Sequence, residues 1–299
     1  MKIHFARLVI DSNAILGEGP VWDWKRQLLF WVDIEGKQLL QFDPVTLKKN
    51  TWHFKEMIGS AVPTTTGKIL LGLESGLSLF DLKEGKSSFL GILESNGPNM
   101  RYNDGKVSPN GDFWIGSMHK EFVPKTGNLF RVTQHYEKSI QISKTTISNG
   151  MAWSADRKTF YFIDSPSFEV KRYDFDLKNS VISNPRTAFR IPEAYGTPDG
   201  MCIDTEDMLW VAHWGGGCVR RWNPTTGEVL QKIEVPAPHV TSCCFGGKNL
   251  DTLYITSARS GMNEEQIKKY PLSGGLFSFK TQVSGTPITY FKEICHTQE

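Results

Sequence analysis

Four residues with oxygen-bearing side chains recur at the same point of a repeated sequence pattern. They are Glu18, Asn103, Asn149 and Asp199. In each passage a small polar turn residue follows five positions later, at Asp23, Ser108, Ser154 and Asp204. If the repeat closes into a ring, the first four side chains meet at its centre. Two carboxylates and two amides are hard oxygen donors, which suit calcium, magnesium or manganese and admit zinc through the carboxylate oxygens.

The chemistry of such a site follows from its charge and its open coordination. Glu18 and Asp199 carry a formal charge of −2, which balances one divalent cation. Three or four protein ligands leave coordination positions for water and substrate, which favours catalysis over a purely structural role. A metal there would polarise a carbonyl group and acidify a water molecule, and a neighbouring carboxylate would accept the proton. Asp199 is the first candidate for this general base, and Asp104 is the second.

Each of these residues also has a structural interpretation. Asn and Asp before Gly are common turn formers, and each alone is more often a turn residue than a ligand. Four at one phase of a repeat favour the metal site. Arg101, two residues before Asn103, suits the hydroxyl or carbonyl oxygens of a polar substrate, and a surface arginine paired with an acid is the alternative. His119 and Glu121 follow the next strand and are candidates for binding substrate hydroxyls.

The elements that position these residues are short strands. Apolar runs are brief, rich in β-branched and aromatic residues, and bounded by Gly, Pro, Asn and Asp, as in residues 68–73 and 77–81. The one helix-like stretch is 263–269. The four polar residues are separated by 85, 46 and 50 residues, and the first interval holds two repeats. With further repeats near Ser60 and Thr241, six units of about 40–50 residues, each with about four strands, are typical of propeller blades.

We therefore predict an all-β fold, a six-bladed β-propeller with a metal site in its central channel. Such a ring is commonly closed by pairing a strand from one terminus with the blade formed by the other. Residues 3–10 are the candidate for an outer strand of the last blade. Nothing in the sequence indicates a linker, so we expect a single domain over residues 1–299.

The bulk properties exclude several classes of function. Of the 299 residues 39% are hydrophobic and 22% are charged, and the formal net charge is +2 with both signs interspersed. No basic run suited to nucleic acid or an anionic membrane occurs, and no apolar stretch approaches the ~20 residues of a membrane span. GxSxG and P-loop motifs, and a GxGxxG motif in a helical context, are also missing, which argues against serine hydrolases and nucleotide binding.

Cysteine usage bears on the compartment. The five cysteines include the vicinal Cys243 and Cys244 but no CxxC pair, so a zinc knuckle or a redox pair of that type is not expected. We expect reduced thiols and a cytoplasmic location, and a secreted form with an oxidised pair is the alternative.

Five passages together resemble one known family. They are residues 16–22 (LGEGPVW), 101–106 (RYNDGK), 147–153 (ISNGMAW), 198–204 (PDGMCID) and 241–247 (TSCCFGG). In this order and spacing they resemble the SMP-30/gluconolactonase/LRE family, over about residues 15 to 279. The resemblance implies a six-bladed propeller with one divalent metal in its channel. It also implies hydrolysis of sugar lactones such as gluconolactone, with some members acting on other esters or phosphotriesters.

The resemblance further implies roles for single residues. The family's metal ligands fall on Glu18, Asn149 and Asp199, and its substrate-contacting residues fall on Arg101, Asn103 and Glu121. Asp199 also matches the family's proposed general base. Just before Glu121, where animal members carry acidic residues, this chain has His119 and Lys120. The mouth of the channel is therefore less acidic, which leaves the preferred lactone open.

Three functions follow from these observations. The leading one is a hydrolase of small-molecule sugar lactones with one Ca, Zn, Mg or Mn ion and no nucleic-acid, membrane or obligate protein partner. The second is a calcium-binding regulatory protein with little or no turnover, although the chain lacks an EF-hand loop. The third is a propeller that serves only as a protein-binding scaffold, which the in-phase Glu18, Asn149 and Asp199 disfavour.

Overall fold

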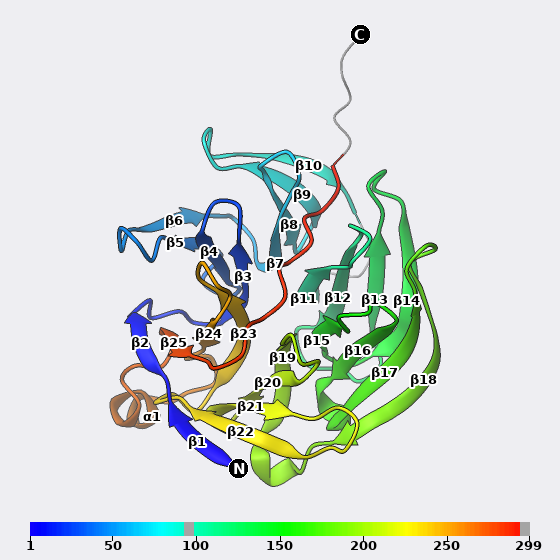
Figure 1. Ribbon diagram of the computed structural model, residues 1–299. Coiled ribbons are helices and arrows are strands. Elements are labelled where there is room, and N and C mark those ends of the chain that lie inside the picture. Colours follow the sequence, from blue (N-terminus) through cyan, green and yellow to red (C-terminus); the bar gives the residue numbers. More distant parts are fainter. Residues whose placement is uncertain (93–98, 294–299) are drawn as a thin grey trace.

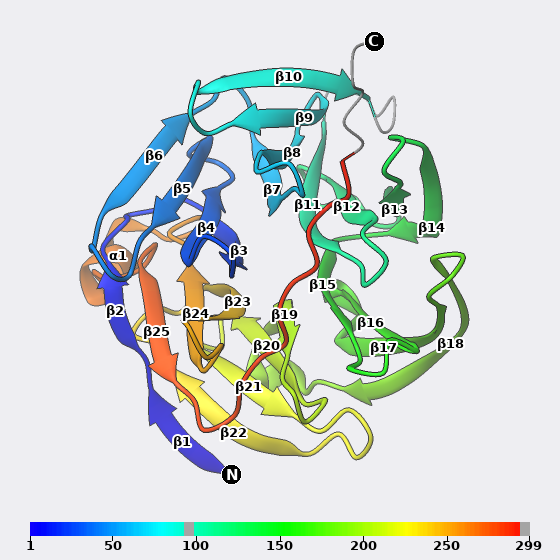
Figure 2. The same ribbon diagram turned by 45° about the horizontal axis from the view of Figure 1, so that its top comes forward.

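Six β-sheets stand around a central axis in the computed structural model, which describes residues 1–92 and 99–293 (Figure 1). Figure 2 shows the innermost strand of each sheet facing the centre of the ring. Each innermost strand contacts the innermost strands of both neighbouring sheets, so the ring is closed. The predicted six-bladed β-propeller is confirmed.

The first three blades are each formed by four consecutive antiparallel strands. Blade one comprises β3 (Gly17–Asp23), β4 (Leu28–Asp33), β5 (Gln38–Phe42) and β6 (Lys49–His53). Blade two comprises β7 (Ile58–Pro63), β8 (Ile69–Leu73), β9 (Gly76–Asp81) and β10 (Lys86–Gly91). Blade three comprises β11 (Met100–Val107), β12 (Phe113–His119), β13 (Gly127–Val132) and β14 (Lys138–Thr145).

The last three blades follow the same plan, and the N-terminal strands join two of them. Blade four comprises β15 (Ser148–Trp153), β16 (Thr159–Asp164), β17 (Glu169–Asp176) and β18 (Val181–Arg190). Blade five comprises β19 (Thr197–Ile203), β20 (Leu209–Trp214), β21 (Cys218–Trp222), β22 (Val229–Glu234) and β1 (Lys2–Phe5). Blade six comprises β23 (Val240–Gly246), β24 (Thr252–Ser257), β25 (Leu276–Lys280) and β2 (Arg7–Ile10).

The N-terminal segment closes the ring in two steps. Strand β2 pairs antiparallel with β25 as the outer strand of blade six, as predicted. Strand β1 instead pairs in parallel with β22 of blade five, so the prediction of one strand over residues 3–10 is wrong for its first half. Blade six needs only four residues to complete it, and the residues before them cover the exposed edge of the neighbouring blade. Ala6, between the two strands, donates its N–H to Glu234 O at 2.8 Å.

Helical structure is sparse in the described part of the chain. There are two short 3₁₀ turns in these residues. Turn η1 (Ser165–Ser167) joins β16 to β17 within blade four, and η2 (Glu193–Tyr195) precedes β19, the inner strand of blade five. The helix α1 (Glu264–Lys269) agrees with the predicted helix-like stretch. Its capping box joins Asn263 and Gln266, which satisfies backbone donors at the first turn.

Large aromatic side chains fill the spaces between the blades. Five tryptophans are at most 2% exposed: Trp22, Trp31, Trp114, Trp210 and Trp222. Trp22 stacks on Tyr254 across the boundary between blades one and six, with ring centroids 5.8 Å apart. Because such rings bury large apolar areas, they fix how neighbouring blades lie and so where the inner strands meet.

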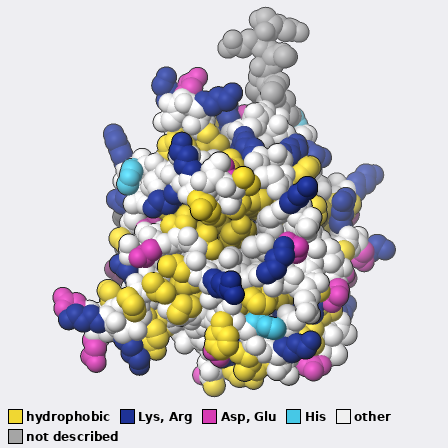
Figure 3. All heavy atoms as spheres, turned by 60° about the vertical axis from the view of Figure 1, so that its left-hand side comes forward, with side chains coloured by type: hydrophobic (Ala, Val, Ile, Leu, Met, Phe, Trp, Pro, Cys, Tyr) yellow, Lys and Arg dark blue, Asp and Glu magenta, His cyan; other side chains and the backbone are white. Residues whose placement is uncertain are grey.

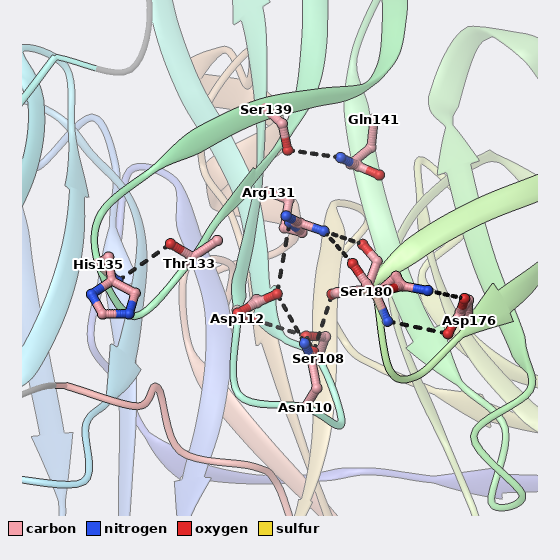
Figure 4. A network of polar contacts seen from close by, with 11 residues as sticks. Ser108, Asn110, Asp112, Arg131, Thr133, His135, Ser139, Gln141, Asp176 and Ser180 are labelled. Atoms are coloured by element: carbon pink, nitrogen blue, oxygen red, sulfur yellow. Dashed lines mark hydrogen bonds and ion pairs between the residues drawn. The ribbon is translucent and has the colours of Figure 1, made fainter.

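A polar network joins blades three and four near their outer turns (Figure 4). Arg131 Nη1 donates to Asn179 O at 2.6 Å and to Ser180 O at 2.8 Å, both in the β17–β18 turn. Its Nε lies 3.7 Å from Asp112 Oδ2. Ser180 Oγ in turn donates to Asn110 Oδ1 at 3.1 Å. The network therefore links the β11–β12 turn to the outer turn of the next blade.

The C-terminal segment after β25 crosses one mouth of the channel (Figure 2, red). It forms a bridge with Asp204 through Gly285 and a bridge with Thr64 through Phe291, so it runs from blade five to blade two. Phe291 is fully buried, and Tyr290 Oη donates to Asp23 Oδ1 at 2.6 Å. We call residues 281–293 the C-terminal strap. The path of this segment was not predicted from the sequence.

The surface carries charges of both signs. On the face shown in Figure 3, basic and acidic side chains lie among hydrophobic and neutral ones. None of the helices in the described residues is both long and apolar enough to span a membrane.

Candidate functional site

Every innermost strand has a register irregularity near its first residues. The shifts fall between Glu18 and Val21, Ile58 and Ser60, Tyr102 and Gly105, Asn149 and Met151, Pro198 and Met201, and Val240 and Ser242. Bulges of this kind bend a strand and re-aim its side chains. The four recurrent polar residues lie at four of these bulges, so the sequence repeat corresponds to a repeated backbone feature.

The two amides of the repeat are joined to each other. Asn103 Nδ2 donates to Asn149 Oδ1 at 3.2 Å and to Ser148 O at 2.9 Å. Asn149 Nδ2 donates to Ser165 Oγ at 3.0 Å. Both amides are buried. Asn103 and Asn149 come from blades three and four, so these contacts confirm that residues 46 positions apart meet at the channel.

Three carboxyl groups complete the buried cluster. Glu18, Asp104 and Asp199 are 5%, 5% and 7% exposed. Burial raises the pKa of Glu18 to about 8, and the charge of Asp104 adds to the shift. Burial also raises the pKa of Asp199 well above its usual range, followed by the charges of Glu18 and Asp104. The pKa of Asp104 is raised by burial, which Lys106 and the Gly105 N–H oppose. The three groups therefore repel one another when ionised.

One oxygen of this cluster has no partner. Within the described part of the chain, Asp199 Oδ1 is buried and accepts no hydrogen bond. A buried polar atom without a partner costs free energy, so such an atom in a folded protein calls for an explanation. No group of three His, Cys, Asp or Glu side chains among the described residues has metal-binding geometry. A cation held here would therefore need amide oxygens as well as carboxylates.

The donor set fits a hard divalent cation. Its side chains offer oxygen atoms in a buried space, which calcium, magnesium and manganese prefer. When ionised, the three carboxylates carry −3 and the neighbouring Arg101 and Lys106 carry +2, which leaves a net charge of −1 that attracts a cation.

Arg101 is buried beside these carboxylates and is not a surface residue. Its Nη1 donates to Asn103 Oδ1 at 2.6 Å and to Tyr102 O at 3.0 Å. Burial lowers the pKa of Arg101, and the charges of Glu18 and Asp199 are among those that oppose this. The guanidinium therefore fixes the Asn103 amide and places positive charge next to the acidic cluster.

Glu121 differs from the other predicted site residues. It is exposed, in the turn after β12, and its N–H donates to His119 Nδ1 at 3.1 Å. The described residues show no hydrogen bond or ion pair between Glu121 and the buried cluster. Its neighbour Lys120 forms an ion pair with Glu74 of blade two. The positive charge of Lys120 in this turn is thus partly neutralised by an acid from the adjacent blade.

Lys106 is a member of this region that the sequence prediction did not single out. Its Nζ donates to Met201 O at 2.7 Å, so it reaches from blade three across the channel to blade five. The signal was present in the sequence, because Lys106 follows Asp104 within the RYNDGK passage. The repeat pattern does not show how far a side chain reaches across the channel, so the contact of Lys106 with blade five could not be predicted.

Comparison with known proteins agrees with this architecture. Residues 16–259 match the family described as the SMP-30/Gluconolactonase/LRE-like region. This chain belongs to that family. The match confirms the predicted resemblance and includes all six predicted site residues.

Individual relatives share most of their length with this chain. Regucalcin of Xenopus laevis is 38% identical over 274 residues, which cover 90% of this chain and 92% of that protein. A Bacillus subtilis protein, YvrE, provisionally named a sugar lactone lactonase, is 34% identical over 290 residues, 97% of this chain and 99% of that protein. The structure of a calcium-binding protein, regucalcin, from Agrobacterium tumefaciens superimposes with a TM-score of 0.93 at 26% identity, over 97% of this chain and 99% of that one.

Proposed function

We propose that this protein is a divalent-metal-dependent hydrolase that opens sugar lactones, with Glu18, Asn149 and Asp199 as the metal ligands. The observation that carries the proposal is the buried, partnerless Oδ1 of Asp199 beside two further buried carboxyl groups. An arrangement that raises the pKa of its own acids gains from a cation. The relative provisionally named a sugar lactone lactonase supports the substrate class.

The metal has one task in this proposal. A bound calcium, zinc, magnesium or manganese ion would supply positive charge that polarises the lactone carbonyl and lowers the pKa of a water molecule. Glu18 and Asn149 would hold it through their side-chain oxygens, together with Asp199. Asn149 Nδ2 donates to Ser165 Oγ, so its Oδ1, which accepts from Asn103, is the atom that would bind the metal.

Asp199 also moves the proton. One carboxylate oxygen of Asp199 would bind the metal, and the other accepts a proton from the attacking water while the water oxygen bonds to the carbonyl carbon. The ring C–O bond then breaks, and the proton passes to the leaving ring oxygen, which becomes the hydroxyl group of the product acid. Asp104 is the second candidate for this base, since it is buried beside Asp199 and its pKa is also raised.

The remaining predicted residues bind the substrate. Arg101 and Asn103 form one hydrogen-bonded unit, so the remaining N–H groups of Arg101 would donate to substrate oxygens from a fixed position. The N–H groups of the Asn103 amide donate to Ser148 and Asn149, and Asn103 would contact the substrate beside Arg101. Glu121, at the exposed turn, would accept a hydrogen bond from a sugar hydroxyl. A small-molecule lactone is the only partner that this proposal needs.

The proposal is tested by a metal-replete hydrolysis screen over five- and six-membered aldonolactones, with proton release as the readout. We expect turnover in the wild type and a loss of about 10²-fold or more in Asp199→Ala, because a positioned general base contributes that much. Asp176→Asn is the matched control, since Asp176 is an exposed aspartate in the β17–β18 turn. Equal turnover in Asp199→Ala and the control contradicts the proposal.

A calcium-binding regulatory protein without turnover is the second candidate. The structural relative from Agrobacterium tumefaciens, described as calcium-binding, favours it. The two candidates share the metal site and differ in chemistry. Calcium binding that Glu18→Gln weakens, in a protein that opens none of the lactones with any of the four metals, would select the regulatory candidate.

A further inference from the structure

A cavity of about 460 Å³ lies in the half of the channel between the buried cluster and the C-terminal strap. Asp104 and Gly19 line its inner end, and Thr286 to Thr289 of the strap line its outer end. Ala155, Arg157 and Pro287 are exposed residues of its lining, so it reaches the solvent there. Of the residues that the lactonase proposal uses, Asp104 alone lines this cavity.

Three of the cavity's lining residues are cysteines: Cys202 of β19, and Cys243 and Cys244 of β23. All four cysteines of residues 1–92 and 99–293 are free thiols, and Cys295 lies outside these ranges. The Sγ atoms of Cys202 and Cys243 are 3.6 Å apart. Cys243 Sγ also lies 3.4 Å from Trp210 O, to which it donates, so the Cys202 S–H is the donor between the two sulfurs.

The backbones that carry the two thiols lie close together. A Cβ placed on Gly200, two residues before Cys202, would come within 2.1 Å of Ser242 Oγ, next to Cys243. Only a residue without a side chain permits this approach of β19 to β23. A disulfide has an S–S length of about 2.05 Å. The two sulfurs therefore need to approach by about 1.5 Å to form a disulfide.

We propose that Cys202 and Cys243 are a dithiol site that hydrogen peroxide, entering through the channel cavity, oxidises to a disulfide between blades five and six. Cys202 Sγ attacks one peroxide oxygen, the O–O bond breaks, and a sulfenic acid and one water form. Cys243 Sγ then attacks Cys202 Sγ, the S–S bond forms and a second water leaves. The two sulfurs lose two electrons in total, and the peroxide is reduced to two waters.

The surroundings select a small, uncharged oxidant. Cys202 and Cys243 are 7% and 2% exposed, and both line the cavity, so we infer that a reagent reaches them from it. Burial raises the pKa of the Cys202 thiol well above its usual range, and the Lys106 ammonium opposes this in part. A thiol that stays protonated reacts slowly, so we expect the oxidation to be slow. Oxidised glutathione is much larger than hydrogen peroxide, so we expect it to react more slowly.

The site has a consequence for the buried cluster. Cys202 lies three residues after Asp199 on the same strand, and Met201 O between them accepts from Lys106. A covalent link from Cys202 to blade six therefore restrains the strand that carries Asp199.

The test is peptide mapping of the reduced wild-type protein after treatment with hydrogen peroxide, followed by alkylation of the remaining thiols. We expect a Cys202–Cys243 cross-linked peptide that dithiothreitol removes. Cys218→Ala and Cys244→Ala keep this cross-link, since Cys218 lies outside the cavity lining and Cys244 packs toward Trp22. Cys243→Ala abolishes it.

Two results overturn the proposal. One is a wild-type map in which Cys202 and Cys243 stay alkylatable, or in which either of them is linked to another cysteine. The other is cross-linking by oxidised glutathione at the same rate as by hydrogen peroxide, because that result contradicts access through the cavity. The wild-type map alone decides the first point, so failure of a variant to fold does not affect it.

Discussion

Asp199 and Asp204 lie at the two ends of one inner strand, β19, and both are buried. Asp204 has four donors: the N–H groups of Glu206 and Met208 for Oδ1, and Trp210 Nε1 and Arg221 Nε for Oδ2. Asp199 Oδ1 has none within the described residues. One aspartate thus closes a turn after the strand, and the other has an acceptor without a donor near the start of the strand.

The turn residues of other repeats accept hydrogen bonds as Asp204 does. Among these turn residues, Asp23 accepts from the N–H groups of Lys25 and Arg26, and Ser154 Oγ accepts from Thr159 N at 3.0 Å. Five residues earlier in their repeats, the carboxyl groups of Glu18 and Asp199 lie near other carboxyl groups. The turn interpretation and the ligand interpretation therefore apply to different members of one repeat, five residues apart.

The largest effect on stability is expected at the lower end of the strand. Asp204→Ala leaves Arg221 and Trp210 without their buried acceptor, so we expect the free energy of unfolding to fall by about 3–5 kcal/mol. Denaturant unfolding of the metal-free protein measures this. Asp199→Ala is the matched change near the start of the strand and should cost much less, because it removes a repelling charge and leaves no donor to Oδ1 without its acceptor. A similar loss in both variants would remove the distinction.

The fold and the amide pair were predictable from the sequence because the repeat is set by local rules. Turn residues, short β-branched runs and a polar residue at each bulge recur at a fixed phase, so Asn103 and Asn149 could be placed together. The parallel pairing of β1 and the path of the C-terminal strap could not be predicted, since both depend on which blade edge is left uncovered. The burial of Arg101 and the contact of Cys202 with Cys243 depend on how closely inner strands approach, which no spacing encodes.

A second, smaller effect is the pH dependence of the metal-free protein. The folded pKa of Glu18, about 8, is above its ordinary value of 4.5. The folded state therefore holds a proton that the unfolded state releases, and this contribution to stability is full below pH 4.5, falls as the pH rises, and is lost near pH 8. We expect the thermal midpoint to fall between pH 5 and 8, and Glu18→Gln to reduce that slope.

The control for this measurement is Asp176→Asn. The pKa of Asp176 is lowered, mainly by its bond from Asn179, so it titrates below the window in which Glu18 changes charge. Its slope should equal that of the wild type. A Glu18→Gln protein with the wild-type slope would place the titrating group elsewhere.

The smallest effect is expected far from the channel, in the network of Figure 4. Arg131→Met removes two donations to the β17–β18 turn, so we expect a loss of about 1–2 kcal/mol in the free energy of unfolding. Lactone turnover per folded molecule should not change. A change in turnover as large as that of Asp199→Ala would show that the outer blade contacts set the site geometry.

The most direct test of the account is the thermal midpoint measured with and without a divalent cation. A cation that binds only the folded state at about 100 times its Kd stabilises it by about 2.7 kcal/mol. The account predicts a clear rise for the wild type and Asp176→Asn, and little or none for Asp199→Asn and Glu18→Gln. An equal rise in all four proteins would contradict it, because the cation would then bind somewhere other than the upper end of the channel.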